Sequence, residues 1–301
     1  METVEEKKGM NGWQKLIVFL SIIVVLICGV IYYSRFIATT GLTVKEYTIK
    51  NSKIPDSFHG AKIIHISDLH YKTTYYKKEV AKMVKKINER KPDLVVLTGD
   101  LFDKDTKYTS KDFEELTEEL LKIDPTIGKY AISGNHDMQV PEWETVIKNS
   151  GFTNLNDTFD TVYMNSLNPL LIVGASSSLN NMKDINDRLK PANDYIKSIT
   201  GQEKKNNIPN YKILLLHEPD YIEDIDYQQF DLILAGHSHN GQIRIPGIGA
   251  VILPEGAKKY YAQHYTLNQT ELYISSGLGT STIPYRLFNK PTINLYRLAN
   301  K

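Results

Sequence analysis

Cysteine and a surplus of either charge are what this sequence has least of. Its 301 residues include a single cysteine, Cys28, which excludes a disulfide framework and a cysteine-based zinc site within one chain. Lysine and arginine total 36 against 35 aspartate and glutamate, and a charge so balanced argues against nucleic-acid binding through a basic surface. The composition, 41% hydrophobic and 24% charged, lies near the globular average and excludes disordered, collagenous and coiled-coil chains.

One long run, from Leu16 to Ser34, lacks charge altogether and predicts a membrane-spanning helix. At 1.5 Å per residue it extends about 28 Å, close to the thickness of a hydrocarbon core of about 30 Å. Trp13 stands before it and Tyr32 and Tyr33 near its end, as interfacial aromatic residues do. A cleaved signal peptide is the alternative. The run is longer than the roughly 7–15 apolar residues typical of such peptides, however, and no good small-residue cleavage site follows.

The charges that flank this run give only a weak indication of its orientation. Basic residues precede it at Lys7, Lys8 and Lys15 and follow it at Arg35, Lys45 and Lys50. The positive-inside signal is therefore nearly balanced. Because Lys15 adjoins the run, we expect a single-pass protein of the cell membrane with its N-terminus in the cytoplasm and its body outside.

The rest of the chain predicts an α/β fold, because short apolar runs alternate with amphipathic helical patterns. Tyr47 and Ile49 indicate an edge strand, and the Gly-, Pro- and β-branched-rich sequence beyond Gly241 indicates hairpins. Buried strands are expected at 62–67, 94–98, 130–133, 170–173, 212–216 and 232–235, and helices at 77–90, around 113–121 and around 185–199.

Five of these strands are followed by residues that bind metals. In open α/β sheets, ligands bind beyond the carboxyl ends of the strands. Carboxylates, imidazoles and amide oxygens suit divalent transition ions, and more candidates are present than one ion needs. The seven candidate ligands are Asp68, His70, Asp100, Asn135, His217, His237 and His239.

Each of these short motifs alone occurs by chance, and only their conjunction at successive strand ends is informative. His59, His65 and His264 stand apart from the motifs, and we expect them to have structural roles. Arg244 and Arg286 lie near the C-terminal motifs. Each fits either a second phosphate contact or an exposed salt bridge equally well.

The motifs SDLH, GDLFD, GNHD, LLLHEPD and AGHSHNGQIRIP resemble the calcineurin-like metallophosphoesterase superfamily. More narrowly, the sequence resembles its bacterial membrane-associated YkuE/YaeI-like branch, which shares the GHxHxGQ run and a C-terminal glycine-rich segment, here Ser276-Gly277-Leu278-Gly279. The resemblance covers about residues 42–301 and implies one phosphoesterase domain there, after a tail, anchor and linker over residues 1–41. It also implies a four-layer α/β/β/α sandwich of two mixed sheets.

The same resemblance assigns roles to individual residues. One metal ion would be held by Asp68, His70, Asp100 and His239, and a second by Asp100, Asn135, His217 and His237, so that Asp100 bridges the two. His136 would be the catalytic histidine, and Asp103 would orient it. The two ions are expected to be divalent, with Mn²⁺ favoured and Fe or Zn²⁺ as alternatives.

The resemblance and the ligand chemistry together predict a dinuclear-metal-dependent phosphoesterase in which a metal-bridging hydroxide attacks phosphorus directly. We expect a phosphodiesterase or pyrophosphatase with a membrane-associated or lipid-linked substrate, because the anchor holds the site near a bilayer. A phosphomonoesterase acting on protein or small-molecule phosphoesters is the alternative. A non-catalytic metal-stabilised interaction module is a third hypothesis, but the loss of a ligand or of the catalytic histidine that it predicts is absent. The membrane is the expected partner, nucleic acid is not, and the oligomeric state is left open.

Overall fold

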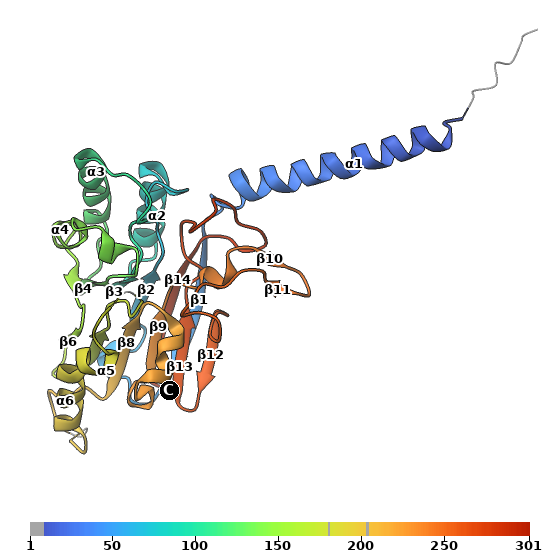
Figure 1. Ribbon diagram of the computed structural model, residues 1–301. Coiled ribbons are helices and arrows are strands. Elements are labelled where there is room, and N and C mark those ends of the chain that lie inside the picture. Colours follow the sequence, from blue (N-terminus) through green and yellow to red (C-terminus); the bar gives the residue numbers. More distant parts are fainter. Residues whose placement is uncertain (1–8, 180, 203–204) are drawn as a thin grey trace, which may run out of the picture.

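The computed structural model describes residues 9–179, 181–202 and 205–301, and within them two six-stranded mixed sheets lie face to face (Figure 1). The first sheet has the order β1 (Thr43–Lys50), β14 (Thr292–Ala299), β2 (Lys62–Ile66), β3 (Leu94–Thr98), β4 (Gly128–Ile132) and β5 (Thr153–Asn154). The second has the order β12 (His264–Leu267), β13 (Thr270–Ile274), β9 (Leu232–Ala235), β8 (Tyr211–Leu216), β7 (Leu170–Gly174) and β6 (Thr158–Val162).

Helices cover the outer face of each sheet. The first sheet packs against α2 (Lys77–Glu89), α3 (Ser110–Leu121) and α4 (Trp143–Asn149), and the second against α5 (Ile185–Arg188) and α6 (Lys190–Ile199). A separate apolar cluster fills the space between the sheets, with Val96 and Ile132 from one and Ile213 and Leu234 from the other. These three cores define four layers, which confirms the expected α/β/β/α sandwich.

The apolar patterns of the sequence explain which faces are buried. In α2, the side chains of Val80, Met83, Val84 and Ile87 recur at helical spacing and are all buried against the first sheet. The expected helix around 185–199 differs, because it is divided into α5 and α6 at Leu189. Pro191 explains the division, since a proline fits the first turn of a helix but cannot donate a hydrogen bond within it.

Strand direction brings the metal-binding motifs to one edge of the sandwich. Strands β2, β3 and β4 run parallel in the first sheet, as do β8 and β9 in the second. Their carboxyl ends therefore deliver five loops to the same edge. The C-terminal hairpins expected from the sequence are also present, as β10 (Arg244–Ile245) with β11 (Gly249–Ala250) and as β12 with β13.

The uncharged N-terminal run forms α1 (Gly12–Tyr32), which projects away from the sandwich (Figure 1). A π-helical turn extends it to Ile37, and in the described part of the chain this is the single helix long and apolar enough to cross a membrane. The end of this helix contacts the body, because the Arg286 amide donates a hydrogen bond to the Ser34 carbonyl at 3.0 Å and Ser34 is buried.

Candidate metal centre

The five strand-end loops bring all seven candidate ligands into one buried cluster. Asp68, His70 and His217 are fully enclosed, and the remaining four are at most 8% exposed. Two groups of converging donor atoms consist of candidate ligands alone: Asp68, His70 and His239 form one, and Asp100, His217 and His237 form the other. A third group combines His70 and Asp100 with His136, the expected catalytic histidine.

In the first group, the Nε2 atoms of His70 and His239 lie 3.1 Å apart. Asp68 Oδ1 lies 3.5 Å from His239 Nε2, and Asp100 Oδ2 lies 3.6 Å from His70 Nε2. These lone pairs therefore point into a single small space, as the ligands of a cation do.

In the second group, His217 Nε2 lies 3.3 Å from Asp100 Oδ2 and 3.3 Å from Asn135 Oδ1. The His237 ring lies against that of His217, with centroids 5.0 Å apart. Asp100 thus has carboxylate contacts in both groups.

Hydrogen bonds on the outer side of two rings fix which nitrogen faces the cluster. His217 Nδ1 lies 2.6 Å from the Thr98 carbonyl, and His237 Nε2 lies 2.7 Å from the Glu255 carbonyl. When the ring is neutral, it must donate its one proton outward to that oxygen, which leaves the lone pair of the other nitrogen directed toward the centre. The motifs do not reveal these partners, because backbone carbonyls carry no side-chain signal.

The backbone of this cluster is held in an uncommon conformation. Asp68, His70, Asp100, His237 and His239 have φ values of 52°, 41°, 51°, 63° and 46°, in the left-handed region that costs most side chains free energy. The loops also approach one another closely: a Cβ atom on Gly99 would lie 2.5 Å from His217 Nδ1. Such strain persists where the surrounding structure enforces it, and it clusters at functional sites.

The charges within the cluster indicate what it lacks on its own. Burial raises the pKa of Asp68, so its carboxylate needs a compensating charge. Burial also acts on Asp100 and His217, but their mutual attraction outweighs it and lowers the pKa of Asp100 while raising that of His217. Burial, with help from the charges of His70 and Arg286, lowers the pKa of His239. A divalent cation would supply the missing positive charge without protonating any ring, so the donor set fits a metal.

His136 is more exposed than any of the candidate ligands. Its side chain is 12% exposed and lines a pocket, and its Nδ1 accepts a hydrogen bond from the Lys104 amide at 3.2 Å. The neutral ring therefore carries its proton on Nε2. Asp103 Oδ2 lies 3.5 Å from Nδ1 of both His136 and His70, so that carboxylate faces two rings.

Asp137, the residue that follows His136, holds two of the loops together. Its carboxylate accepts hydrogen bonds from the amides of Gly134 and Phe102 at 3.0 and 2.9 Å. Burial and the nearby Asp100 charge raise the pKa of Asp137 to about 7.

The exposed salt bridge considered for Arg286 is excluded, because this arginine is not at the surface. Its side chain is fully buried and donates to the carbonyls of Gly279 and Ser276, and its Nη2 lies 3.3 Å from His239 Nδ1. Tertiary contacts explain this burial. The glycine-rich segment packs beneath the loop that carries Asp68, and there the Gly279 amide donates to the Asp68 carbonyl at 2.8 Å. Arg244, in contrast, stays partly exposed and donates to Asn240.

The structural role expected of His65 is confirmed. Its ring is fully buried between the sheets and its Nε2 lies 2.8 Å from Thr98 Oγ1. His59 lies beside Asn300, and His264 pairs with Glu271 on β12 and β13. None of these three contacts the metal-binding groups.

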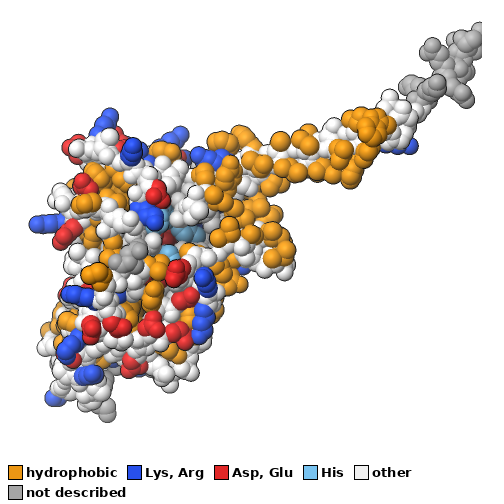
Figure 2. All heavy atoms as spheres, in the orientation of Figure 1, with side chains coloured by type: hydrophobic (Ala, Val, Ile, Leu, Met, Phe, Trp, Pro, Cys, Tyr) orange, Lys and Arg blue, Asp and Glu red, His pale blue; other side chains and the backbone are white. Residues whose placement is uncertain are grey.

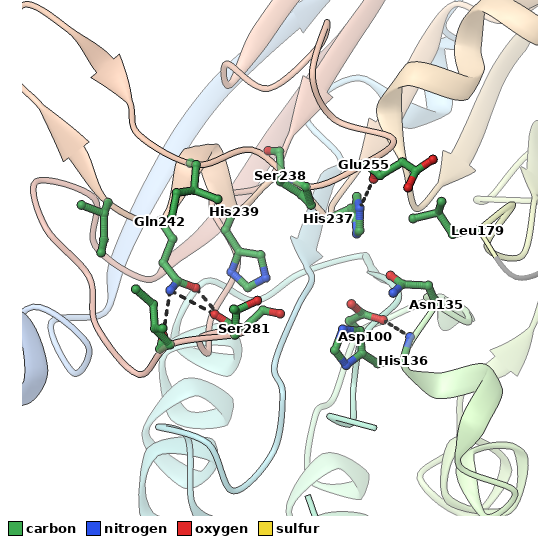
Figure 3. Close-up of a pocket in the computed structure, with 16 residues that line it drawn as sticks. Asp100, Asn135, His136, Leu179, His237, Ser238, His239, Gln242, Glu255 and Ser281 are labelled. Atoms are coloured by element: carbon green, nitrogen blue, oxygen red, sulfur yellow. Dashed lines mark hydrogen bonds between the residues drawn. The ribbon is translucent and has the colours of Figure 1, made fainter. Parts of the chain in front are cut away.

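A pocket of about 310 Å³ opens over the cluster (Figure 3). Its floor is polar and includes Asp100, Asn135, His136, His237 and His239. Its walls are largely apolar, with Leu179, Ile243, Ile252, Pro254 and Ile283. A ligand that fills the pocket would therefore place a polar group on the cluster and an apolar part against the walls.

The chain is similar in sequence to known proteins. The profile of the calcineurin-like phosphoesterase family matches residues 61–241. The metallophosphoesterase YkuE of Bacillus subtilis, itself uncharacterised, is 32% identical over 270 residues, which cover 88% of each chain. Phosphodiesterase YaeI of Escherichia coli is 27% identical over 79% of this chain and 82% of its own. A Danio rerio transmembrane protein with a metallophosphoesterase domain is 26% identical, over 97% of this chain and 64% of its own.

The chain therefore belongs to the calcineurin-like phosphoesterase family. The resemblance carried by the five motifs is confirmed, both for the superfamily and for the branch that includes YkuE and YaeI.

Proposed function

We propose that this protein is a dinuclear-metal-dependent phosphodiesterase or pyrophosphatase that acts on a membrane-associated or lipid-linked substrate. Two converging donor groups share the Asp100 carboxylate, and this observation supports the proposal most strongly. A shared carboxylate lets two cations lie close together, as in enzymes that displace an oxygen from phosphorus.

The ligand roles in this proposal are those that the motifs predict. Asp68, His70 and His239 would hold one ion and Asn135, His217 and His237 the other, with Asp100 contacting both. When bound, two divalent ions would activate water and offset the negative charge of the phosphoryl group. Mn²⁺ is favoured among ions that accept this mixture of oxygen and nitrogen ligands.

His136 would act on the substrate and not on the ions. Because the Lys104 amide donates to Nδ1, the proton on Nε2 is free to reach a phosphoryl or leaving oxygen. The His136 amide also donates to Asp100 Oδ1 at 3.0 Å, which ties the position of the ring to the shared ligand. Asp103 is a positioning residue in this scheme, because its Oδ1 accepts a hydrogen bond from the Asp105 amide at 3.0 Å and so holds the turn whose Lys104 amide donates to His136.

Two features favour a substrate with an apolar part. The pocket walls above the polar floor are formed largely by aliphatic side chains. The chain also carries a helix suited to a bilayer, so a lipid-borne phosphoester would reach the site at high local concentration.

The substrate class is tested with the full chain, loaded with Mn²⁺ and reconstituted in lipid nanodiscs. Turnover is compared for bis- and mono-(p-nitrophenyl) phosphate and for phospholipid and lipid-pyrophosphate substrates in the same discs. We expect the diester to exceed the monoester and a lipid substrate to show the highest kcat/KM. Preference for the monoester would instead identify a phosphomonoesterase. Hydrolysis of none of them by metal-loaded protein would contradict an enzymatic role.

The orientation of the anchor is part of the same proposal. With the N-terminus in the cytoplasm, residues 42–301 would lie outside the cell membrane, and the substrate would be extracytoplasmic. Protease added to intact cells without an outer wall should then digest the domain and leave a short membrane stub. Protection until lysis would reverse the orientation, and a soluble form beginning near residue 40 would identify a signal peptide.

A further inference from the structure

Large apolar side chains are exposed on the part of the body nearest α1. Ile248, Ile252 and Phe288 are 75%, 68% and 65% exposed. We call the following residues the hairpin surface: Ile245, Ile248, Val251, Ile252, Ile283 and Phe288. Figure 2 shows orange side chains continuing from α1 onto the body on this side, whereas charged side chains are frequent over the far end. An apolar patch of this kind marks an interaction site in a soluble domain.

The hairpin surface is connected to the turn that carries the candidate ligand His239. Gly241, two residues after His239, packs so closely on Ala250 of β11 that a Cβ atom would not fit. The Val251 amide donates to the Ile243 carbonyl at 3.1 Å, and the Gln242 amide group donates to the Ile283 carbonyl at 2.9 Å. The segments that carry several of the exposed residues are therefore joined directly to the turn that carries His239.

The position of the hairpin relative to α1 indicates what covers it. The β10–β11 hairpin projects from the body on the side from which α1 leaves it (Figure 1). The backbone hydrogen bond from Arg286 to Ser34 joins the body directly to the end of the apolar helix. Phe36 and Ile37, at the end of the apolar helix, are themselves 56% and 51% exposed. A bilayer around α1 would therefore meet the hairpin surface next.

Positive charge gathers where the chain leaves the helix. A groove of about 510 Å³ runs beside Thr40–Thr43. Four lysines line it, Lys82, Lys85 and Lys86 from α2 and Lys290 from the segment before β14, against a single acidic residue, Glu89. Lysines near a membrane surface attract lipid phosphates. Apolar side chains and lysines at the base of one helix are the combination found at a bilayer interface.

We propose that the hairpin surface inserts into the lipid interface beside the anchor, so that the pocket opens toward the bilayer. Ile252 and Ile283 belong both to this surface and to the pocket wall, so they form a continuous apolar path from lipid to the metal cluster. Insertion itself is independent of catalysis. Only the role of the path in admitting a lipid substrate rests on the proposed function.

The insertion is tested by fluorescence with the full chain in nanodiscs. Cys28→Ser removes the single native cysteine, and Ile248→Cys then accepts an environment-sensitive nitrobenzoxadiazole label at the hairpin tip. The matched control places the label at Lys197→Cys on α6, at the end of the body away from α1 (Figure 1). We expect blue-shifted emission and quenching by shallow doxyl-lipids for the hairpin label, and neither for the control.

Water-like emission of the hairpin label without quenching by doxyl-lipids would overturn the proposal. Shielding that requires two protein copies in one disc would also overturn it, by assigning the surface to a second copy of the chain.

The second arm measures activity and separates this proposal from the proposed function. Ile248→Glu places a charge at the tip without contacting the pocket. We expect at least a tenfold lower kcat/KM on a phosphodiester lipid in the disc, with turnover of soluble bis(p-nitrophenyl) phosphate within about twofold of wild type. Equal loss on both substrates would overturn the role of the path. Inactivity of wild type on both would contradict the proposed function while leaving the fluorescence result intact.

Discussion

The floor and the walls of the pocket differ in their origin as well as in their chemistry. The floor is made of charged and polar side chains from strand-end loops, mostly in a left-handed conformation. The walls are aliphatic and come mainly from the segment after the last metal-binding motif. The family profile ends at residue 241, the point where the hairpin begins. In the proposed enzyme, chemistry and substrate choice would therefore be carried by adjacent but separate parts of the chain, and variants in each part would test them separately.

The largest effect should follow from removing the one carboxylate common to both donor groups. Asp100→Asn removes the negative charge of the ligand that both metal ions are expected to share. Bound metal should therefore fall from two ions per chain to fewer than one, and hydrolysis should be lost. Elemental analysis after reconstitution with Mn²⁺ or Zn²⁺ measures the metal. Asp105→Asn, exposed on the same loop, is the control and should keep both ions. Saturation of wild type at a single ion would exclude the bridging role.

The next effect concerns the one histidine of the floor that is left for the substrate. His136→Ala should lower kcat by roughly 10²–10⁴-fold, the range for a lost general acid. Metal content should not change, because His136 is not among the expected ligands. Asp103→Asn should cause a smaller loss in the same direction. Release of an ion from His136→Ala would instead show that this ring is a ligand.

A third prediction compares two arginines that the sequence alone does not distinguish. Arg286→Met removes a buried guanidinium and leaves several carbonyls without donors, which should lower the free energy of unfolding by about 3–5 kcal/mol. Arg244→Met, at a partly exposed position, should cost about 1 kcal/mol or less. Denaturant unfolding of the full chain in detergent measures both. Similar losses would contradict the structural role of Arg286.

The smallest effect tests the core between the sheets and not the site. Burial lowers the pKa of His65 to about 3, against an ordinary 6.5. In the unfolded chain the His65 ring therefore binds a proton below pH 6.5, whereas in the folded chain it stays neutral down to about pH 3. The free energy of unfolding thus falls as the pH decreases through this window. At pH 5 the loss is about 2 kcal/mol. His65→Gln should remove that part of the slope, measured as the difference from wild type in unfolding at pH 7 and pH 5. Parallel pH profiles would refute it.

The elements that were correctly predicted from the sequence have local causes. Strands β3 and β9 match the expected ranges because an uninterrupted apolar run between polar loops leaves little choice of register. Helix α2 follows from the spacing of its four buried residues. The break between α5 and α6 was missed because the apolar periodicity continues across Pro191 and outweighed its effect in the prediction.

The candidate ligands were identifiable for a related reason. Asp68 with His70, and His237 with His239, are only two residues apart, so each pair is brought to one place by its own loop. The resemblance to the family then assigned the individual ligands to two metal ions.

By itself, the sequence determined the family, the alternating strands and helices, the apolar N-terminal helix and the seven candidate ligands, because each depends on residues near one another in the chain. Only the tertiary structure decided the rest. It buried Arg286 beneath the first loop, fixed the ring nitrogens of His217 and His237 by carbonyls from distant segments, and set the hairpin surface beside α1. These contacts depend on how separate loops and elements come together in the folded chain, and the free energy that holds them comes from the packing of the whole sandwich.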